Sequence, residues 1–122
     1  MKHLLNWVEI PVLDMERAKK FYSAILDISF QDMPLEDMLY AFFPSEDQYN
    51  SGALVQSPFY KPCAEGVLIY LNGGEDLNIV LEKVNKAGGN VVMPKTLISD
   101  MAGYAGMFID TEGNRIGVHS MK

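Results

Sequence analysis

The amino-acid sequence predicts an α+β fold in which a βαβββ module occurs twice, with the helices on the outer face of a cup-shaped, partly open barrel-like sheet. Two observations predict it. A strand followed by an amphipathic helix occurs at the same place in each half of the 122-residue chain, and three strand-like segments follow each helix. The length fits a single domain over residues 1–122. Module one covers about residues 1–57, a connector about 58–65, and module two about 66–122.

The first module begins with a strand that leads into a helix. Val8, Ile10 and Val12 alternate with residues of the other face, and this period of two is typical of a strand between two different environments. Asp14 follows, and its carboxylate can accept hydrogen bonds from the free amides of a first helical turn. Apolar residues then recur at helical spacing over residues 15–26, with charged residues on the opposite side. These patterns predict a strand and then an amphipathic helix.

The same order returns in the second module. Residues 67–71 form a short apolar run, and acidic residues follow where a helix N-terminus favours negative charge. Apolar residues over 77–84 recur at i, i+3, i+4 and i+7, and Gly88 ends the pattern. Asp14 and Asp76, which precede the two helices, are 62 positions apart, about half of the chain. The second half is therefore predicted to repeat the first.

Each helix is followed by three strand-like segments that turn residues separate. The predicted strands are residues 28–33, 38–43 and 53–56 in module one, and 90–98, 104–109 and 115–119 in module two. A hairpin is predicted between the last two strands, because Gly113 can adopt a positive φ in the turn. The sheet is expected to be largely antiparallel, with both helices on one face.

The charge balance excludes several classes of partner. The chain has 10 Lys and Arg against 16 Asp and Glu, which gives a net charge of −6. Nucleic acids and anionic membranes both require a basic face, so neither is expected as a partner. A negatively charged ligand, such as a phosphorylated substrate, is also disfavoured by the net field.

Cysteine content and hydropathy predict a cytoplasmic protein. Cys63 is the only cysteine, so the chain can form neither an intrachain disulfide nor a cysteine-based zinc site. We expect an ordinary free thiol. Polar residues interrupt the N-terminal segment before a signal-peptide core develops. No apolar run approaches the ~18 residues that span a membrane.

Three segments, in their order along the chain, resemble a known family. They are WVEIPVLDMERAKKFY at residues 7–22, AGGNVVMP at 87–94 and GYAGMFIDTEGNRIG at 103–117. With the half-chain repeat, they resemble the vicinal-oxygen-chelate superfamily, which includes glyoxalase I, extradiol dioxygenases, methylmalonyl-CoA epimerase and bleomycin-resistance proteins. The resemblance spans essentially the whole chain. It implies a cup that is open to a small molecule, and it implies a homodimer.

The resemblance also implies where a divalent metal would be held. The ligands would be a His or Gln near the start of the first strand of each module and a Glu on the last strand. Trp7 and Gly117 stand at two of these positions, and neither residue can bind a metal. Gln56, near the end of the fourth strand, has ligand capacity. We therefore expect no metal cofactor, with Zn, Ni, Mn or Fe bound only if the site is displaced.

Strand alternation selects the polar residues of the cup face. If Val8 and its alternating partners face the helix, Glu9 faces the cup, and the same parity places Arg115 and His119 there. Glu9 and His119 are the candidate catalytic pair, because a carboxylate and an imidazole can move a proton. The alternatives are a salt bridge between Glu9 and Arg115, and an ordinary exposed or hydrogen-bonded position for His119. His3 shares this parity, but fraying is expected so near the terminus.

Aromatic residues and Arg115 are the candidate ligand-binding residues. Trp7 could stack on a flat ligand or fill the space of the missing metal. Tyr70, on the cup face of the fifth strand, could add a phenol. Tyr104 follows a loop at residues 99–103 that could form a lip over the cup. Packing is the alternative for Tyr70, and a simple connection is the alternative for the loop.

Two functions of different classes remain. The first is a metal-free protein that binds a small apolar or aromatic molecule in its cup, similar to the bleomycin-resistance branch; Trp7 and Gly117 favour it. The alternative is a lyase, isomerase or dioxygenase of the same superfamily. It would use a displaced metal, or Glu9 and His119 as acid and base.

Overall fold

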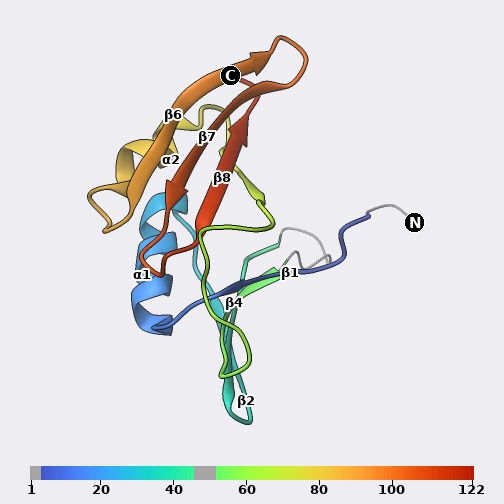
Figure 1. Ribbon diagram of the computed structural model, residues 1–122, viewed down its shortest axis with the longest axis vertical. Helices are drawn as coiled ribbons and strands as arrows, with labels where there is room; N and C mark the ends of the chain where they lie inside the picture. The colour runs from blue at the N-terminus through green and yellow to red at the C-terminus, as the bar shows by residue number, and fades with distance from the viewer. Residues whose placement is uncertain (1–3, 46–51) are drawn as a thin grey trace.

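The computed structural model describes residues 4–45 and 52–122, which form two helices and two four-stranded sheets (Figure 1). The elements in chain order are β1 (Val8–Pro11), α1 (Met15–Leu26), β2 (Gln31–Leu35), β3 (Met38–Phe42), β4 (Gly52–Gln56), β5 (Tyr70–Asn72), α2 (Asn78–Val84), β6 (Asn90–Ser99), β7 (Gly103–Ile109) and β8 (Arg115–Ser120). No helix in this part of the chain is long and apolar enough to cross a bilayer.

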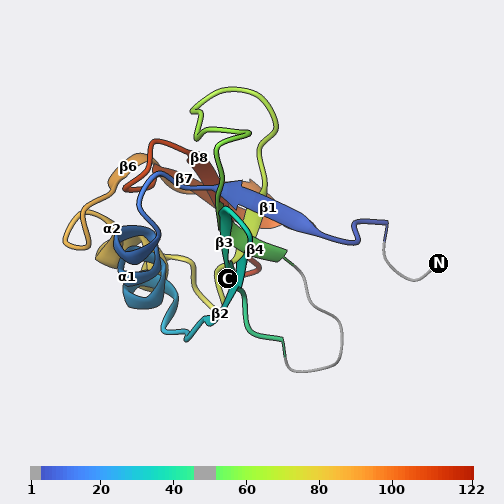
Figure 2. The same ribbon diagram turned by 90° about the horizontal axis from the view of Figure 1, so that it is seen from below.

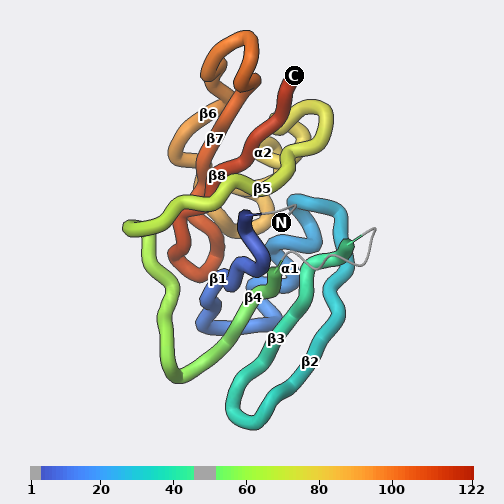
Figure 3. Tube along the Cα trace, turned by 90° about the vertical axis from the view of Figure 1, so that its right-hand side faces the viewer, coloured from blue at the N-terminus to red at the C-terminus, as the bar shows by residue number. Residues whose placement is uncertain are grey.

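The two sheets share one topology, which confirms the predicted repeat. Their strand orders are β1-β4-β3-β2 and β5-β8-β7-β6. In each sheet the first strand pairs in parallel with the last, and the other neighbours are antiparallel. The edge strands β1 and β5 lie near each other in the middle of the molecule (Figure 3). The predicted α+β fold of two modules is confirmed, as two separate sheets that do not close into a barrel.

One hydrophobic core joins the two modules. Both helices lie on the same side of the molecule (Figure 2). Phe21 of α1 packs against Phe108 of β7 with ring centroids 5.7 Å apart, so the helix of module one contacts the sheet of module two. Ile10 of β1 and Ile116 of β8 are buried in the same core. The predicted core-facing positions of the first and last strands are therefore confirmed.

Helix α1 has the predicted bounds because polar groups cap both of its ends. The Asp14 carboxylate accepts a hydrogen bond from the Arg17 amide at 3.1 Å. The side-chain oxygen of Gln56 accepts from the Met15 amide at 2.9 Å. The helix ends at Asp27, which has a φ of 55° and donates its amide to the Ser23 carbonyl.

The hairpin turn between β7 and β8 ties the modules together. Asp110 is buried, and its carboxylate accepts hydrogen bonds from the amides of Glu112 and Asn114 and from the Tyr22 hydroxyl of α1 at 2.6 Å. Asn114 donates its side-chain amide to the Pro11 carbonyl of β1 at 2.8 Å. Burial and the neighbouring Asp110 carboxylate raise the pKa of Tyr22 well above its ordinary value. The turn therefore holds both β1 and α1.

Module two departs from the prediction at its first strand. The apolar run at residues 67–71 is only partly a strand, because β5 pairs with β8 only over Tyr70–Asn72. Val67 is 92% exposed and lies outside the strand. Val67 is apolar but exposed, so the apolar composition of residues 67–71 predicted a longer strand than the one that pairs with β8. In module one, β2 similarly begins at Gln31 rather than at residue 28.

Candidate functional site

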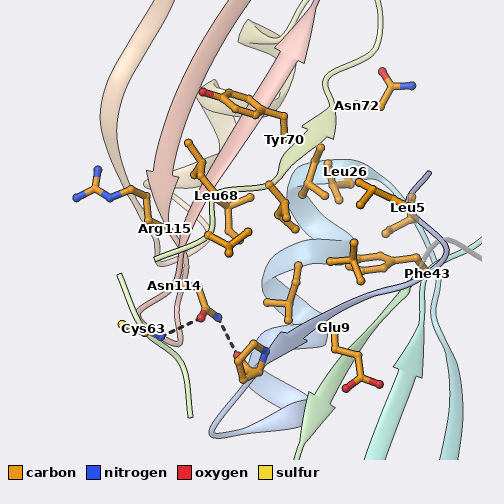
Figure 4. Close-up of a pocket in the computed structure, with 18 of the residues that line it drawn as sticks. Leu5, Glu9, Leu26, Phe43, Cys63, Leu68, Tyr70, Asn72, Asn114 and Arg115 are labelled. Carbon is orange, nitrogen blue, oxygen red and sulfur yellow. Dashed lines mark hydrogen bonds between the residues drawn. The ribbon is translucent and has the colours of Figure 1, made fainter. Parts of the chain in front are cut away.

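A cavity of about 880 Å³ lies between the two inner edge strands, β1 and β5 (Figure 4). Among the described residues β1 pairs only with β4 and β5 only with β8, so no backbone ladder there closes the gap between them. The C-terminal end of α1 and the residues after it also line the cavity. Most of the wall is apolar, and its apolar side chains include Leu5, Val8, Leu26, Ile28, Phe43, Leu68, Ile69 and Leu71.

Polar groups line this cavity at its edges, and several are already hydrogen-bonded. Asn114 accepts from the Cys63 amide at 3.2 Å and donates to the Pro11 carbonyl, which anchors the connector to β1 (Figure 4). Arg115 donates its Nε to the Ala64 carbonyl at 3.2 Å. An apolar wall with a few polar groups at its margin is typical of a site for a small organic molecule.

Glu9 lies at the margin of the cavity, and two aromatic side chains hold its carboxylate. The Tyr60 hydroxyl donates to Oε1 at 2.6 Å, and Trp7 Nε1 donates to Oε2 at 3.1 Å. The hydrogen bond to Glu9, together with partial burial, raises the pKa of Tyr60 to about 12. Glu9 is therefore fixed by two neutral donors. The sequence alternative, a salt bridge to Arg115, does not form, and Figure 4 shows the two charged groups pointing apart.

Aromatic side chains cover the open face of the first sheet beside Glu9. The strand register places Glu9, Ala53 and Phe42 in one row across β1, β4 and β3, so their side chains share a face. Trp7 packs edge-on against Phe42 at 5.7 Å, and Tyr40 lies 6.1 Å from the same ring. Ala53 is fully buried although it faces away from the helices. Aromatic packing therefore extends over this face, and Trp7 keeps 38% of its surface exposed.

His119 lies on the other sheet and has its own partner. Its Nε2 contacts the Ala102 carbonyl at 2.5 Å, in the loop that was predicted to form a lip. It lines a second cavity of about 590 Å³ with Tyr70, Asn72 and Ile98. Glu9 is bound by Tyr60 and Trp7, whereas His119 contacts the Ala102 carbonyl, so each member of the candidate catalytic pair has partners of its own. Their catalytic roles stay predictions.

Two predicted ligand-binding tyrosines lie on different faces of the second sheet. Tyr70 is on the face predicted for it, where its ring lies against Gly117. Tyr104 is not on the cup face. It pairs with Ser120 on β8, and its side chain is on the same face of the sheet as those of Phe108 and Ile116, which belong to the core. The Lys95 ammonium lies 4.5 Å from the centre of the Tyr104 ring. The alternation along β7 therefore directs Tyr104 toward the helices.

An indole and a glycine stand at two positions that the resemblance assigns to metal ligands. The Trp7 indole donates to Glu9, and the Tyr70 ring occupies the space beside Gly117. The side-chain oxygen of Gln56 is used by the Met15 amide. Within residues 4–45 and 52–122, no three His, Cys, Asp or Glu side chains gather in a metal-binding arrangement. His3 lies outside the described residues.

Sequence reasoning missed Tyr60, Tyr40 and Phe42. Tyr60 lies in the connector, and no periodic pattern in the sequence indicates that the connector folds back to Glu9. Phe42 and Tyr40 alternate along β3, so strand pairing could have placed them beside Glu9 once the register was known. Parity assigns a face within one strand, whereas contacts between strands require the register.

The fold and the sequence together identify the family. The model of the Glyoxalase/Bleomycin resistance protein/Dioxygenase superfamily matches residues 4–118. The chain belongs to this superfamily. It is 28% identical over 116 residues to a Mycobacterium tuberculosis protein named "Putative glyoxylase CFP32". The match covers 93% of this chain but 44% of that relative, so the chain spans less than half of the mycobacterial protein.

Two solved structures illustrate the shared fold. A glyoxylase/bleomycin resistance protein/dioxygenase domain from Frankia sp. EAN1pec superposes with a TM-score of 0.75 at 15% identity, over 100% of both chains. TnmS3, an antibiotic binding protein from Streptomyces sp. CB03234, superposes with a TM-score of 0.68 at 23% identity, over 98% of this chain and 96% of that one. Identities this low show the fold alone.

Proposed function

We propose that this protein binds a small apolar or aromatic molecule in the cavity between β1 and β5. The observation that carries the proposal is the cavity itself, about 880 Å³ with mainly apolar walls contributed by both modules. Burying apolar surface of a ligand there contributes about 25 cal/mol per Å² before the cost of immobilising it.

Two further observations support binding without a metal. Trp7 and Gly117, at two positions of the family's metal ligands, are a hydrogen-bonded indole and a glycine covered by a ring, and the side-chain oxygen of Gln56 already caps a helix. TnmS3, which has the same fold, is described as an antibiotic binding protein, so this fold can serve binding. The residues at the metal-ligand positions support binding without a metal through their chemistry, and TnmS3 supports it by analogy.

Titration with Nile red, a neutral aromatic dye, tests the site. We expect Nile red fluorescence to increase and then saturate as the protein binds the dye. Ile28→Trp, which fills the cavity, should weaken dye binding by at least about tenfold. Ile79→Trp is the matched control, because Ile79 is 56% exposed on α2 and does not line the cavity. Equal dye affinity for both variants would contradict the proposal. A folded state for each variant is checked by thermal unfolding.

Native mass spectrometry of protein purified without chelator or affinity metal separates this proposal from the alternative enzyme. An organic mass on the chain supports ligand binding and indicates the ligand class. A stoichiometric divalent metal would instead support a displaced-metal lyase, isomerase or dioxygenase.

The proposal includes a cytoplasmic homodimer. Its support is the apolar surface at the β6–β7 end of the second sheet, where Leu97, Ile98 and Met101 are 52%, 55% and 91% exposed. Exposed apolar residues gathered at one end of a sheet are typical of a surface that another chain covers. Light scattering after size exclusion should give twice the mass of one chain, and a monomer mass at micromolar concentration would contradict it.

A further inference from the structure

A second set of side chains gathers on the helix side of the molecule. A cavity of about 700 Å³, here called the interhelical groove, is lined by four basic residues: Arg17, Lys20, Lys83 and Lys86. The whole chain has 10 Lys and Arg, so this one cavity holds four of them. Glu82 is the one acidic residue among the described residues that line it. The groove is therefore a local concentration of positive charge on an acidic protein.

Helix periodicity explains how the basic residues meet. Arg17, Lys20 and Ala24 are three and four positions apart on α1, so they share one stripe of that helix. Lys83 lies near the end of α2, and Lys86 lies in the turn that follows. Helices α1 and α2 lie side by side (Figures 1 and 2). The groove runs between these two stripes.

Arg17 is held in place before any ligand arrives. Its Nε donates to Glu112 Oε2 at 2.7 Å and its Nη2 to Oε1 at 3.0 Å. The Glu112 side chain is fully buried and also accepts from the amides of Leu13 and Asp14. Half of the Arg17 side chain is exposed, and among the described residues Nη1 has no hydrogen-bond partner. A fixed guanidinium loses little entropy when it binds an anion.

The three lysines of the groove have no ion-pair partner among the described residues. Lys19 and Lys95, by contrast, pair with Asp32 at 2.8 Å and with Asp76 at 2.9 Å. Unpaired cations around one cavity repel one another, and a bound anion relieves that repulsion. The groove is thus complementary to negative charge.

The remaining wall of the groove is largely apolar. Ala24 and Ala87 line it between the charged residues, and the core residue Phe21, 1% exposed, lies beneath this wall. Gly88, also on the wall, has a φ of +107°, which a side-chain-bearing residue rarely adopts, and it leaves the wall without a side chain there. A ligand that carries an apolar group next to its charge would contact both kinds of surface.

We propose that the interhelical groove binds a small phosphorylated molecule with an apolar part. A phosphate ester has a double charge and three terminal oxygens, so it can accept from the Arg17 guanidinium and from lysine ammonium groups at once. The net charge of −6 disfavours an anion over most of the surface, but the nearest charges dominate within a Debye length of about 8 Å. This site goes beyond the function proposed for the cavity between β1 and β5 and is independent of it.

Titrations of the ¹⁵N-labelled chain with phenyl phosphate, inorganic phosphate and benzoate test the proposal. We expect saturable shifts of the Ala24, Ala87, Gly88 and Thr111 amides, all of which belong to residues of the groove wall. Phenyl phosphate should bind more tightly than inorganic phosphate, because of its ring, and more tightly than benzoate, because of its second charge. Equal affinity for all three probes, or shifts spread over the whole surface without saturation, would overturn the proposal.

Two matched variants separate the groove from general charge effects. Lys83→Gln/Lys86→Gln should weaken phenyl phosphate binding by at least about tenfold. Lys61→Gln/Lys122→Gln removes two cations that do not line the groove and should leave binding unchanged. Equal weakening by this control would show binding to net charge only and would overturn the site. Nile red binding at the other cavity should be the same in all these variants, so failure at one site is distinguishable from failure at the other.

Discussion

The ring of Tyr70 lies against Gly117 on the neighbouring strand. It occupies the space that a side chain at position 117 would need. A Cβ built on Gly117 would stand 2.5 Å from Cδ2 of Tyr70, well inside van der Waals contact. The two residues are direct partners in the parallel pair of β5 and β8. The resemblance assigns a metal-binding carboxylate to position 117, and the tyrosine ring here fills the space that such a side chain requires.

Substitution of this glycine tests the contact. Gly117→Ala should destabilise the protein by about 1–3 kcal/mol, because the new methyl group meets the Tyr70 ring and then forces it or the strand to move. Chemical unfolding measures the effect. The free energy of unfolding should fall less in the double variant Tyr70→Ala/Gly117→Ala than the sum of the falls in the two single variants. Additive falls would show that the ring and position 117 do not interact.

The buried Glu112 should make stability depend on pH in the acid range. Burial alone would raise the pKa of Glu112, but hydrogen bonds from Arg17, Thr111 and two backbone amides lower it from 4.5 to about 2. The unfolded chain therefore binds this proton at a higher pH than the folded chain does. The stabilisation is complete above pH 4.5 and is lost as the pH falls toward 2.

Glu112→Gln should therefore destabilise the protein at pH 7 by about 1.5–3 kcal/mol, because the charged acceptor of the Arg17 hydrogen bonds is gone. The difference from the wild type should shrink as unfolding is measured at successively lower pH below 4.5. Glu75→Gln, at an exposed position, is the control and should have little effect at any pH. A constant difference between pH 7 and pH 3 would contradict a lowered pKa of Glu112.

Tyr60 should show the opposite dependence on pH. Its hydrogen bond to Glu9 raises its pKa from 10 to about 12, so its contribution to stability is complete below pH 10 and is lost as the pH rises toward 12. Tyr60 is 36% exposed, so Tyr60→Phe should cost no more than about 1 kcal/mol at pH 7. Unfolding of this variant and of the control Tyr70→Phe is compared at pH 7 and pH 11. If the loss of unfolding free energy in Tyr60→Phe were as large at pH 11 as at pH 7, the hydrogen bond between Tyr60 and Glu9 would be refuted.

Added metals should stabilise the protein little if the proposed function is correct. A ligand that binds only the folded state raises the melting temperature by mass action, so a specific metal would produce a saturable rise. We expect no such rise with Zn, Ni, Mn or Fe(II) at concentrations up to tenfold above the protein. A saturable increase, abolished by His119→Ala or Glu9→Gln, would instead locate a displaced metal site.

Hydrophobic patterning along the chain was sufficient to predict the repeat and the buried faces. Hydrophobic periodicity depends only on which residues avoid water, so it gave the bounds of α1 and the core positions Ile10 and Ile116 correctly. It gave the length of β5 wrongly, because an apolar run such as 67–71 does not reveal whether a partner strand is present. Local pattern therefore predicts elements better than it predicts their pairing.

Which side chains meet depended on how segments far apart in the chain pack together. Glu9 and Tyr60 are 51 positions apart and meet because the connector folds back over β1. Tyr104 was a candidate ligand-binding residue and instead lies on the core-facing side of β7, in the alternation that includes Phe108. Arg17 and Glu112 likewise join through the packing of the two modules. Periodicity is a property of neighbouring residues, whereas a site is assembled from distant ones, and only packing brings those together.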